Sequence, residues 1–228
     1  MKPNIDGVWE PNEWNNANEL QLTQTATSGG VTCKGGVYLR LTHDNSSLFG
    51  LVDVVVDDGS EWTVGNKTYV GSISFLFDGN NDGGFQSDDK GDYVVGFSPG
   101  HTGAALWSKS FSNFSSRVLA GISLGPSPHS QIRHRIYEFS IPVQPLIKYA
   151  QLQNGEPVIG FELIVAYASY GLCELVGSSG APARLVFGPI VVAENVDLIM
   201  PLLFVLLVML PGKRRFSIIT GSKRSAGR

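Results

Sequence analysis

Alternation of apolar and polar side chains predicts β-strands along most of the chain. Val37, Leu39 and Leu41 alternate with more polar neighbours, a period of two that is typical of a strand with one buried face. Residues 158–168 are apolar almost throughout, as expected for a strand that is buried on both faces. In chain order, the predicted strands cover residues 20–23, 37–42, 48–56, 68–77, 92–98, 104–111, 117–124, 133–141, 158–168 and 184–192.

Turn-forming residues separate these strands, and no amphipathic helix is predicted between them. The sequence contains 27 Gly and 12 Pro, which provide the breaks that many short strands need. One short helical turn is expected within residues 142–150, where Pro145 limits its start. The sequence therefore predicts an all-β fold, a two-sheet antiparallel β-sandwich over residues 4–193.

An acidic, glycine-rich loop follows the strand predicted at 68–77. Asp78, Asn80 and Asp82 occupy alternate positions before a glycine, and Asp89 falls at position 12 counted from Asp78. Oxygen ligands at this spacing converge on Ca²⁺ in calcium-binding loops. The same residue types also form ordinary solvated turns. We therefore expect either a Ca²⁺ ion held by these four residues, in a loop that leaves a β-strand, or a plain acidic turn.

An apolar run near the C-terminus, residues 198–210, is a candidate membrane anchor. It contains 13 consecutive apolar residues, fewer than the ~20 that a helix needs to cross a bilayer. Basic residues follow the run, as they do on the cytoplasmic side of membrane helices. We predict a short hydrophobic helix that anchors the chain over residues 194–212, with 213–228 as a basic cytoplasmic tail and the sandwich outside the cell. The alternative is one more buried element of the fold.

The distribution of charge argues against nucleic acid as a partner. All 20 acidic residues precede residue 198, whereas six of the 17 basic residues follow it. The body of the chain is therefore acidic, and phosphate binding needs clustered Lys and Arg.

Two cysteines, Cys33 and Cys173, leave two interpretations open. In an oxidising compartment they can form a disulfide that closes a very long loop. In the other interpretation they are two separate buried thiols. A metal site is not indicated, because no histidine or second cysteine lies near either one at the required spacing.

Five short segments, taken in order, resemble the family-9 carbohydrate-binding modules and the wider DOMON-like group of β-sandwich domains. They are Ile5-Asp6-Gly7 with Glu13-Trp14 and Ala17, the hairpin and acidic pair within 37–58, the strand and acidic loop within 75–83, Tyr137 to Pro142 with Leu146, and Gly160 to Leu163. The resemblance implies a jelly-roll-like sandwich that often holds calcium and binds sugars without cutting them. Some relatives belong to glycoside hydrolases, and others bind haem.

The resemblance also implies a sugar clamp made of two tryptophans, for which Trp62 and Trp107 are the candidates. A flat aromatic ring binds the apolar face of a pyranose, and polar groups bind its hydroxyls. Trp62 lies in a polar loop with Asn66, which we include as a sugar-binding residue. The alternatives are that Trp62 packs against the sandwich and that Trp107 belongs to the core.

The sequence favours binding over catalysis. A glycosidase needs two carboxylates that converge across a sugar, and no acidic pair stands out. The four histidines are scattered, and Met1, Met200 and Met209 all lie outside the predicted sandwich, which disfavours a methionine-ligated haem. We expect a non-catalytic protein that binds a polysaccharide or glycan. The alternatives are a structural or adhesive extracellular β-sandwich without a sugar site and, behind it, a glycoside hydrolase or a haem-binding redox domain.

Overall fold

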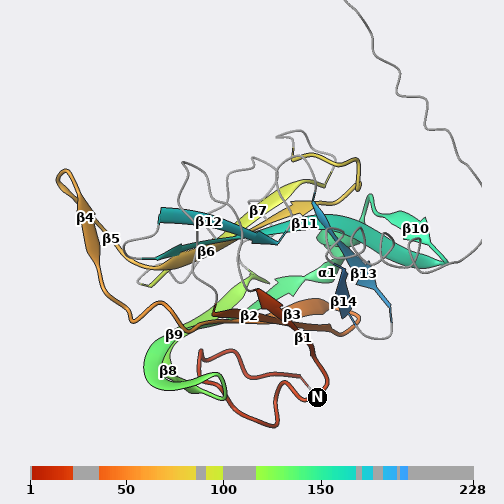
Figure 1. Ribbon diagram of the computed structural model, residues 1–228. Helices are drawn as coiled ribbons and strands as arrows, with labels where there is room; N and C mark the ends of the chain where they lie inside the picture. The colour runs from red at the N-terminus through yellow and green to blue at the C-terminus, as the bar shows by residue number, and fades with distance from the viewer. Residues whose placement is uncertain are drawn as a thin grey trace, which may run out of the picture. The chain divides into compact units, whose positions relative to one another are not determined.

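In the computed structural model the chain folds into antiparallel β-strands, as predicted (Figure 1). The structure describes residues 2–22, 36–85, 91–99, 117–167, 171–176, 182–188 and 191–194. These strands form a five-stranded sheet, a seven-stranded sheet and a separate two-stranded hairpin. The only helix of the described residues is α1 (Val143–Ile147), which lies where one helical turn was expected. The all-β sandwich is therefore confirmed.

The five-stranded sheet is built around two neighbouring hairpins. Its strands are, in spatial order, β1 (Asn18–Leu22), β2 (Val37–His43), β3 (Ser47–Val54), β9 (Ser130–Pro142) and β8 (Leu119–Ser127). Strand β3 pairs with β9 over the whole of its length and, on its other side, with β2 from Leu48 to Val54. The sheet therefore joins chain segments that are more than eighty residues apart in the sequence.

The seven-stranded sheet is organised around its longest strand. Its strands are β14 (Val191–Glu194), β13 (Ala183–Phe187), β11 (Glu156–Tyr167), β6 (Ser72–Asp78) and β7 (Tyr93–Phe97), with β10 (Gln151–Gln153) and β12 (Gly171–Val176) also paired to β11. Strand β11 has 12 residues and lies between β13 and β6 in the sheet. Its apolar run, predicted to be buried, is buried along most of its length.

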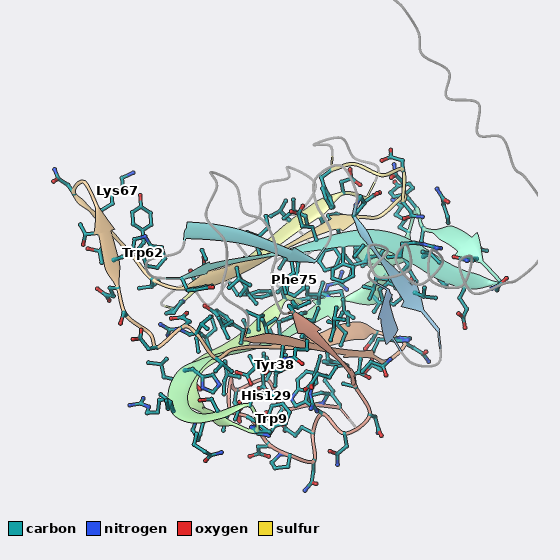
Figure 2. The ribbon with its side chains drawn as sticks, viewed as in Figure 1. Trp9, Tyr38, Trp62, Lys67, Phe75 and His129 are labelled. Carbon is teal, nitrogen blue, oxygen red and sulfur yellow. The ribbon has the colours of Figure 1, made fainter. Side chains whose placement is uncertain are left out.

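The hydrophobic core lies between the two sheets and is rich in aromatic rings. Phe75 of β6 packs against Phe139 of β9 with ring centroids 4.8 Å apart, and Phe97 of β7 stacks on Phe139 at 5.2 Å. Figure 2 shows Phe75 between the two layers. All three rings are at most 2% exposed, and full burial of a phenylalanine contributes about 1.5–3 kcal/mol. This core fixes how the two sheets stack.

The N-terminal segment covers the outer face of the five-stranded sheet. Trp14 is fully buried and forms a second apolar cluster with Phe49, Leu51 and Ile136, which point away from the main core. Strand β3 is consequently buried on both faces.

Two glycines allow the N-terminal segment to lie directly on β8. A Cβ added at Gly121 would fall 2.3 Å from the backbone carbon of Asp6, and one added at Gly7, where φ is +81°, would fall 2.6 Å from the Ile122 nitrogen. Real Cβ atoms do not approach backbone atoms this closely. The segment and the strand therefore meet backbone to backbone.

The structure corrects three of the predicted element boundaries. Residues 60–67, expected to be a loop, contain most of a hairpin formed by β4 (Trp62–Val64) and β5 (Lys67–Tyr69). The strand expected at 68–77 is interrupted at Gly71, where a Cβ would lie 1.9 Å from the Asp57 carboxylate. The strand expected at 184–192 is divided between β13 and β14.

Several predictions concern residues outside the described ranges. They include the strand at 104–111 with Trp107, the position of Cys33, the anchor beyond residue 194 and the basic tail. Within the described ranges, no helix has the length and apolar character needed to cross a membrane. The backbone of Cys173 lies in β12, opposite Val165, and the disulfide stays a prediction.

Candidate functional site

The β4–β5 hairpin is the most prominent local feature that carries a predicted sugar-binding residue. It pairs with no other strand of the described chain and projects from one end of the sandwich (Figure 1). Gly65 and Asn66 form its two-residue turn, and Gly65 has φ +62°, which suits the glycine-first hairpin turn. The turn thus places the two short strands in register.

An aromatic pair occupies one face of this hairpin. Trp62 and Tyr69 are direct cross-strand partners, so their side chains share a face. Their ring centroids are 5.8 Å apart and their planes meet at 22°. Trp62 is half-buried, and Tyr69 is 41% exposed. The pair therefore forms a stacked aromatic unit in contact with solvent, which we call the hairpin platform.

Polar side chains surround the hairpin platform. Glu61, Asn66, Lys67 and Thr68 are all exposed, and Figure 2 shows Lys67 at the tip of the hairpin with Trp62 below it. Aromatic faces beside amide and charged groups are the elements that a sugar site needs. Trp62 and Asn66, the predicted sugar-binding residues, both lie on this hairpin, and Tyr69 lies beside Trp62; their role in sugar binding stays a prediction. Sequence reasoning missed Tyr69, although the Gly-Asn turn between two short runs of β-forming residues was a signal for a hairpin.

The acidic loop after β6 is ordered by backbone amides. Asp78 is fully buried, and its two carboxylate oxygens accept hydrogen bonds from the Asp82 nitrogen at 3.1 Å and the Gly83 nitrogen at 2.9 Å. The Asn80 side chain accepts a bond from the Asp82 nitrogen and donates one to the Asp82 carboxylate. Burial raises the pKa of Asp78, although the bonds from Gly83 and Asp82 oppose the rise.

This arrangement bears on the predicted calcium ion. The oxygens of Asp78 and Asn80 accept hydrogen bonds from backbone nitrogens within the loop, and these bonds help to shape its described part. No group of three or more His, Cys, Asp or Glu in the described ranges is arranged to hold a metal. Asp89 lies outside those ranges, and the four-ligand calcium site stays a prediction.

A second buried carboxylate fastens the N-terminal segment to the sheet. Glu138 of β9 accepts hydrogen bonds from the backbone nitrogens of Asp6 and Gly7, at 3.1 and 2.9 Å, and from the Trp14 indole nitrogen at 2.9 Å. Burial raises the pKa of Glu138 to about 7, against the bonds from Trp14, Gly7 and Asp6, which lower it. The segment that carries Asp6, Gly7 and Trp14 therefore has a structural role.

Two histidines that appeared scattered in the sequence meet at one aspartate. Asp53 of β3 is fully buried, with His129 Nδ1 at 2.7 Å from one oxygen and His134 Nε2 at 2.5 Å from the other. Tyr38 stacks on the His129 ring at 3.5 Å with an interplanar angle of 5°, and Figure 2 shows the two rings together beneath the five-stranded sheet. Because a histidine contacts this buried aspartate on each side, we interpret the cluster as structural.

Comparison with solved structures supports the fold. A family-9 carbohydrate-binding module from Caldicellulosiruptor kristjanssonii, solved in complex with cellotriose, matches with a TM-score of 0.50 and 18% identity, over 79% of this chain and 83% of that one. A glucose complex of a module of the same family and organism gives 0.45 and 15%, over 79% and 84% of the two chains. A protein from Bacteroides uniformis, described as carbohydrate-binding, gives 0.39 and 12%, over 71% and 78%. No protein-family model and no curated protein matches the sequence. The likeness to the cellotriose-bound module shows that this chain has a fold of the family-9 type.

Proposed function

We propose that this protein binds a polysaccharide or glycan without cleaving it, and that the hairpin platform is its sugar-contacting surface. The observation that carries the proposal is the Trp62–Tyr69 pair, which stands on a hairpin that pairs with no other strand of the described residues. Tyr69 is 41% exposed and Trp62 is partly exposed, so the pair offers aromatic surface to a ligand. The similar fold of a module solved with cellotriose supports the choice of ligand class.

The chemistry of the acidic residues also favours binding over catalysis. The buried carboxylates of Asp53, Asp78 and Glu138 are each held by histidines or by N–H donors. A glycosidase needs two carboxyl groups that face each other across a sugar, ~5–10 Å apart and accessible to it. These three carboxylates have structural partners instead.

Affinity electrophoresis in gels that contain soluble polysaccharides tests the proposal. Retardation by at least one polysaccharide is expected, and Trp62→Ala and Tyr69→Ala should each reduce it, since loss of a stacking aromatic weakens sugar contact by about 0.5–1.5 kcal/mol or more. Tyr149→Ala is the matched control, because Tyr149 is 43% exposed, like Tyr69 at 41%, and lies outside the hairpin. Trp107→Ala tests the predicted second clamp residue in the same assay.

The alternative function predicts a different result. If the chain is a structural or adhesive β-sandwich without a sugar site, no polysaccharide in the gels or on a glycan array retains it. If Tyr149→Ala and Tyr69→Ala lose binding to the same extent, the hairpin platform is not the sugar-contacting surface.

We also propose that a membrane anchor over residues 194–212 holds the domain at the cell surface, with residues 213–228 in the cytoplasm. The support is the apolar run 198–210 and the basic residues that follow it. Protease treatment of intact cells should remove the sandwich and leave a basic C-terminal epitope protected. Release of the full chain into the soluble fraction would contradict the anchor.

A further inference from the structure

A polar cleft separate from the hairpin lies beside the turn that joins β2 and β3. Its volume is about 620 Å³, within the range of small-molecule sites, roughly 300–1,000 Å³. The N-terminal segment forms one wall, and the end of β2, the turn and β3 form the other. The lining residues include Lys2, Glu13, Asn15, Asn16, Asp44 and Phe49. No residue of the hairpin platform takes part in it.

The carboxylate of Asp44 is held rigidly at the edge of this cleft. One of its oxygens accepts hydrogen bonds from the Ser46 nitrogen, the Ser46 hydroxyl and the Ser47 nitrogen, all at 2.7 Å. Burial alone would raise the pKa of Asp44, but these bonds and the nearby Lys2 ammonium outweigh it and lower the pKa. A negative charge is therefore fixed there, with the second oxygen left for other partners.

Glu13 provides a second carboxylate, and one of its oxygens lacks a donor. Its Oε1 accepts a bond from the Asn4 nitrogen at 3.0 Å, whereas its Oε2 is buried and has no hydrogen-bond partner. A buried acceptor without a donor is unfavourable. Glu13 lines the cleft, so its carboxylate contributes to the acidic character of the lining.

The chain already places an ammonium group in the cleft. Lys2 Nζ lies 5.6 Å from the centre of the Phe49 ring, within the distance at which a cation is attracted to an aromatic face. Lys2 itself is exposed, so a ligand can take the place of its side chain without disturbing the core. A ligand ammonium at the same place would face an aromatic ring and two carboxylates.

We propose that this cleft binds a small ligand that carries both a primary ammonium and hydroxyl groups, an amino sugar with a free amine, and that Lys2 competes with the ligand for the ammonium position. Carboxylate–ammonium hydrogen bonds are stronger than those between neutral groups, which selects the free amine over its acetylated form. The amide side chains on the wall are suited to the hydroxyls. The site is independent of the hairpin platform and does not rest on its function.

Titration of the ¹⁵N-labelled full chain, followed by NMR, tests the proposal with D-glucosamine, N-acetyl-D-glucosamine and D-glucose as probes. We expect D-glucosamine to shift the amide signals of Ser46 and Ser47 and to bind about tenfold more tightly than the other two, in keeping with a charge-assisted contact. Lys2→Ala should tighten binding about threefold or more, because it removes the competing cation from the ring.

Variants of the carboxylates complete the test. Glu13→Gln and Asp44→Asn should each weaken D-glucosamine binding about tenfold, whereas Glu10→Gln, a nearby exposed carboxyl outside the cleft, should not. Trp62→Ala should leave this binding unchanged, which separates the cleft from the hairpin platform. Equal affinity for D-glucosamine and D-glucose, or weaker binding in Lys2→Ala, would overturn the proposal. Lys2 is exposed, so its variant decides the question even if a carboxylate variant fails to fold.

Discussion

Replacement of Glu138 by glutamine tests the account of the N-terminal segment most directly. The wild-type carboxylate accepts three hydrogen bonds, two from backbone nitrogens and one from the Trp14 indole. An amide has one acceptor oxygen and an NH₂ group that cannot accept. In Glu138→Gln the NH₂ must face either the indole N–H or the two backbone N–H groups. At least one buried donor then loses its partner, which costs about 1–3 kcal/mol of the free energy of unfolding.

The cost should depend on pH in a defined direction. The pKa of Glu138 is about 7 in the folded protein, against an ordinary value of 4.5. Between these two values the folded state keeps a proton that the unfolded state has released, so wild-type stability falls as pH rises through this window, by about 3 kcal/mol at most. The amide of the Glu138→Gln variant does not titrate, so the variant lacks this loss. The difference in stability between wild type and variant should therefore be largest near pH 5 and smaller at pH 8.

Urea unfolding followed by far-UV circular dichroism at pH 5 and pH 8 measures both effects. Trp14→Phe removes the indole donor but also makes the ring smaller. A double-mutant cycle with Glu138→Gln separates the energy of the Trp14–Glu138 hydrogen bond from the effect of ring size. A variant as stable as the wild type at pH 5 would refute the hydrogen-bond argument. If the difference in stability between wild type and Glu138→Gln grows with rising pH, the three donors stabilise the carboxylate more than burial destabilises it.

Three further predictions concern other parts of the structure. Gly121→Ala should lower the free energy of unfolding by about 2–4 kcal/mol, since its methyl group would meet the N-terminal backbone. The control is Gly125→Ala in the same strand, where the atom nearest to an added Cβ is 3.8 Å away. This control should cost under ~1 kcal/mol in the same urea assay. Asp53→Asn should lower the free energy of unfolding by about 3 kcal/mol, because it removes the carboxylate between two histidines. Asp58 is exposed, so Asp58→Asn should cost under ~1 kcal/mol. Equal effects of the two variants would contradict the structural role of Asp53. If calcium binds the acidic loop, CaCl₂ at about a hundredfold excess over Kd should raise the free energy of unfolding by ~2.7 kcal/mol. The gain should appear as a higher Tm, which EDTA reverses and Asp78→Asn abolishes. An unchanged Tm with CaCl₂ would favour the plain acidic turn.

The sequence predicted the layers of the fold because their signal is local. Alternation along residues 37–42 and the apolar run at 158–168 identify strands within a few positions of their observed ends. Residues 62–67, most of the β4–β5 hairpin, were wrongly expected to be a loop, because three-residue strands are too short for alternation to show. The break at Gly71 depends on a contact with Asp57, which local pattern does not contain.

The polar clusters were beyond sequence reasoning because their members are distant along the chain. Glu138 lies 131 positions from Gly7, and His129 lies 76 from Asp53. The Asp53 cluster depends on the pairing of β3 with β9, and the Glu138 cluster depends on the N-terminal segment lying against the sheet. The candidate sugar residues Trp62 and Asn66 could be proposed from the sequence because a tryptophan in a polar segment is conspicuous by itself. Tyr69 needed the register of the hairpin.

The separation of the β4–β5 hairpin from both sheets makes it exchangeable. Its two strands bond only to each other among the described residues, so residues at its tip and on its aromatic face can be replaced without repacking the interior. A library of hairpins grafted between Glu61 and Val70 would therefore retain the scaffold's stability while recognition changes. Variation concentrated on such an appendage is how a single sandwich acquires new ligands, and it makes this domain a practical scaffold for engineered binders.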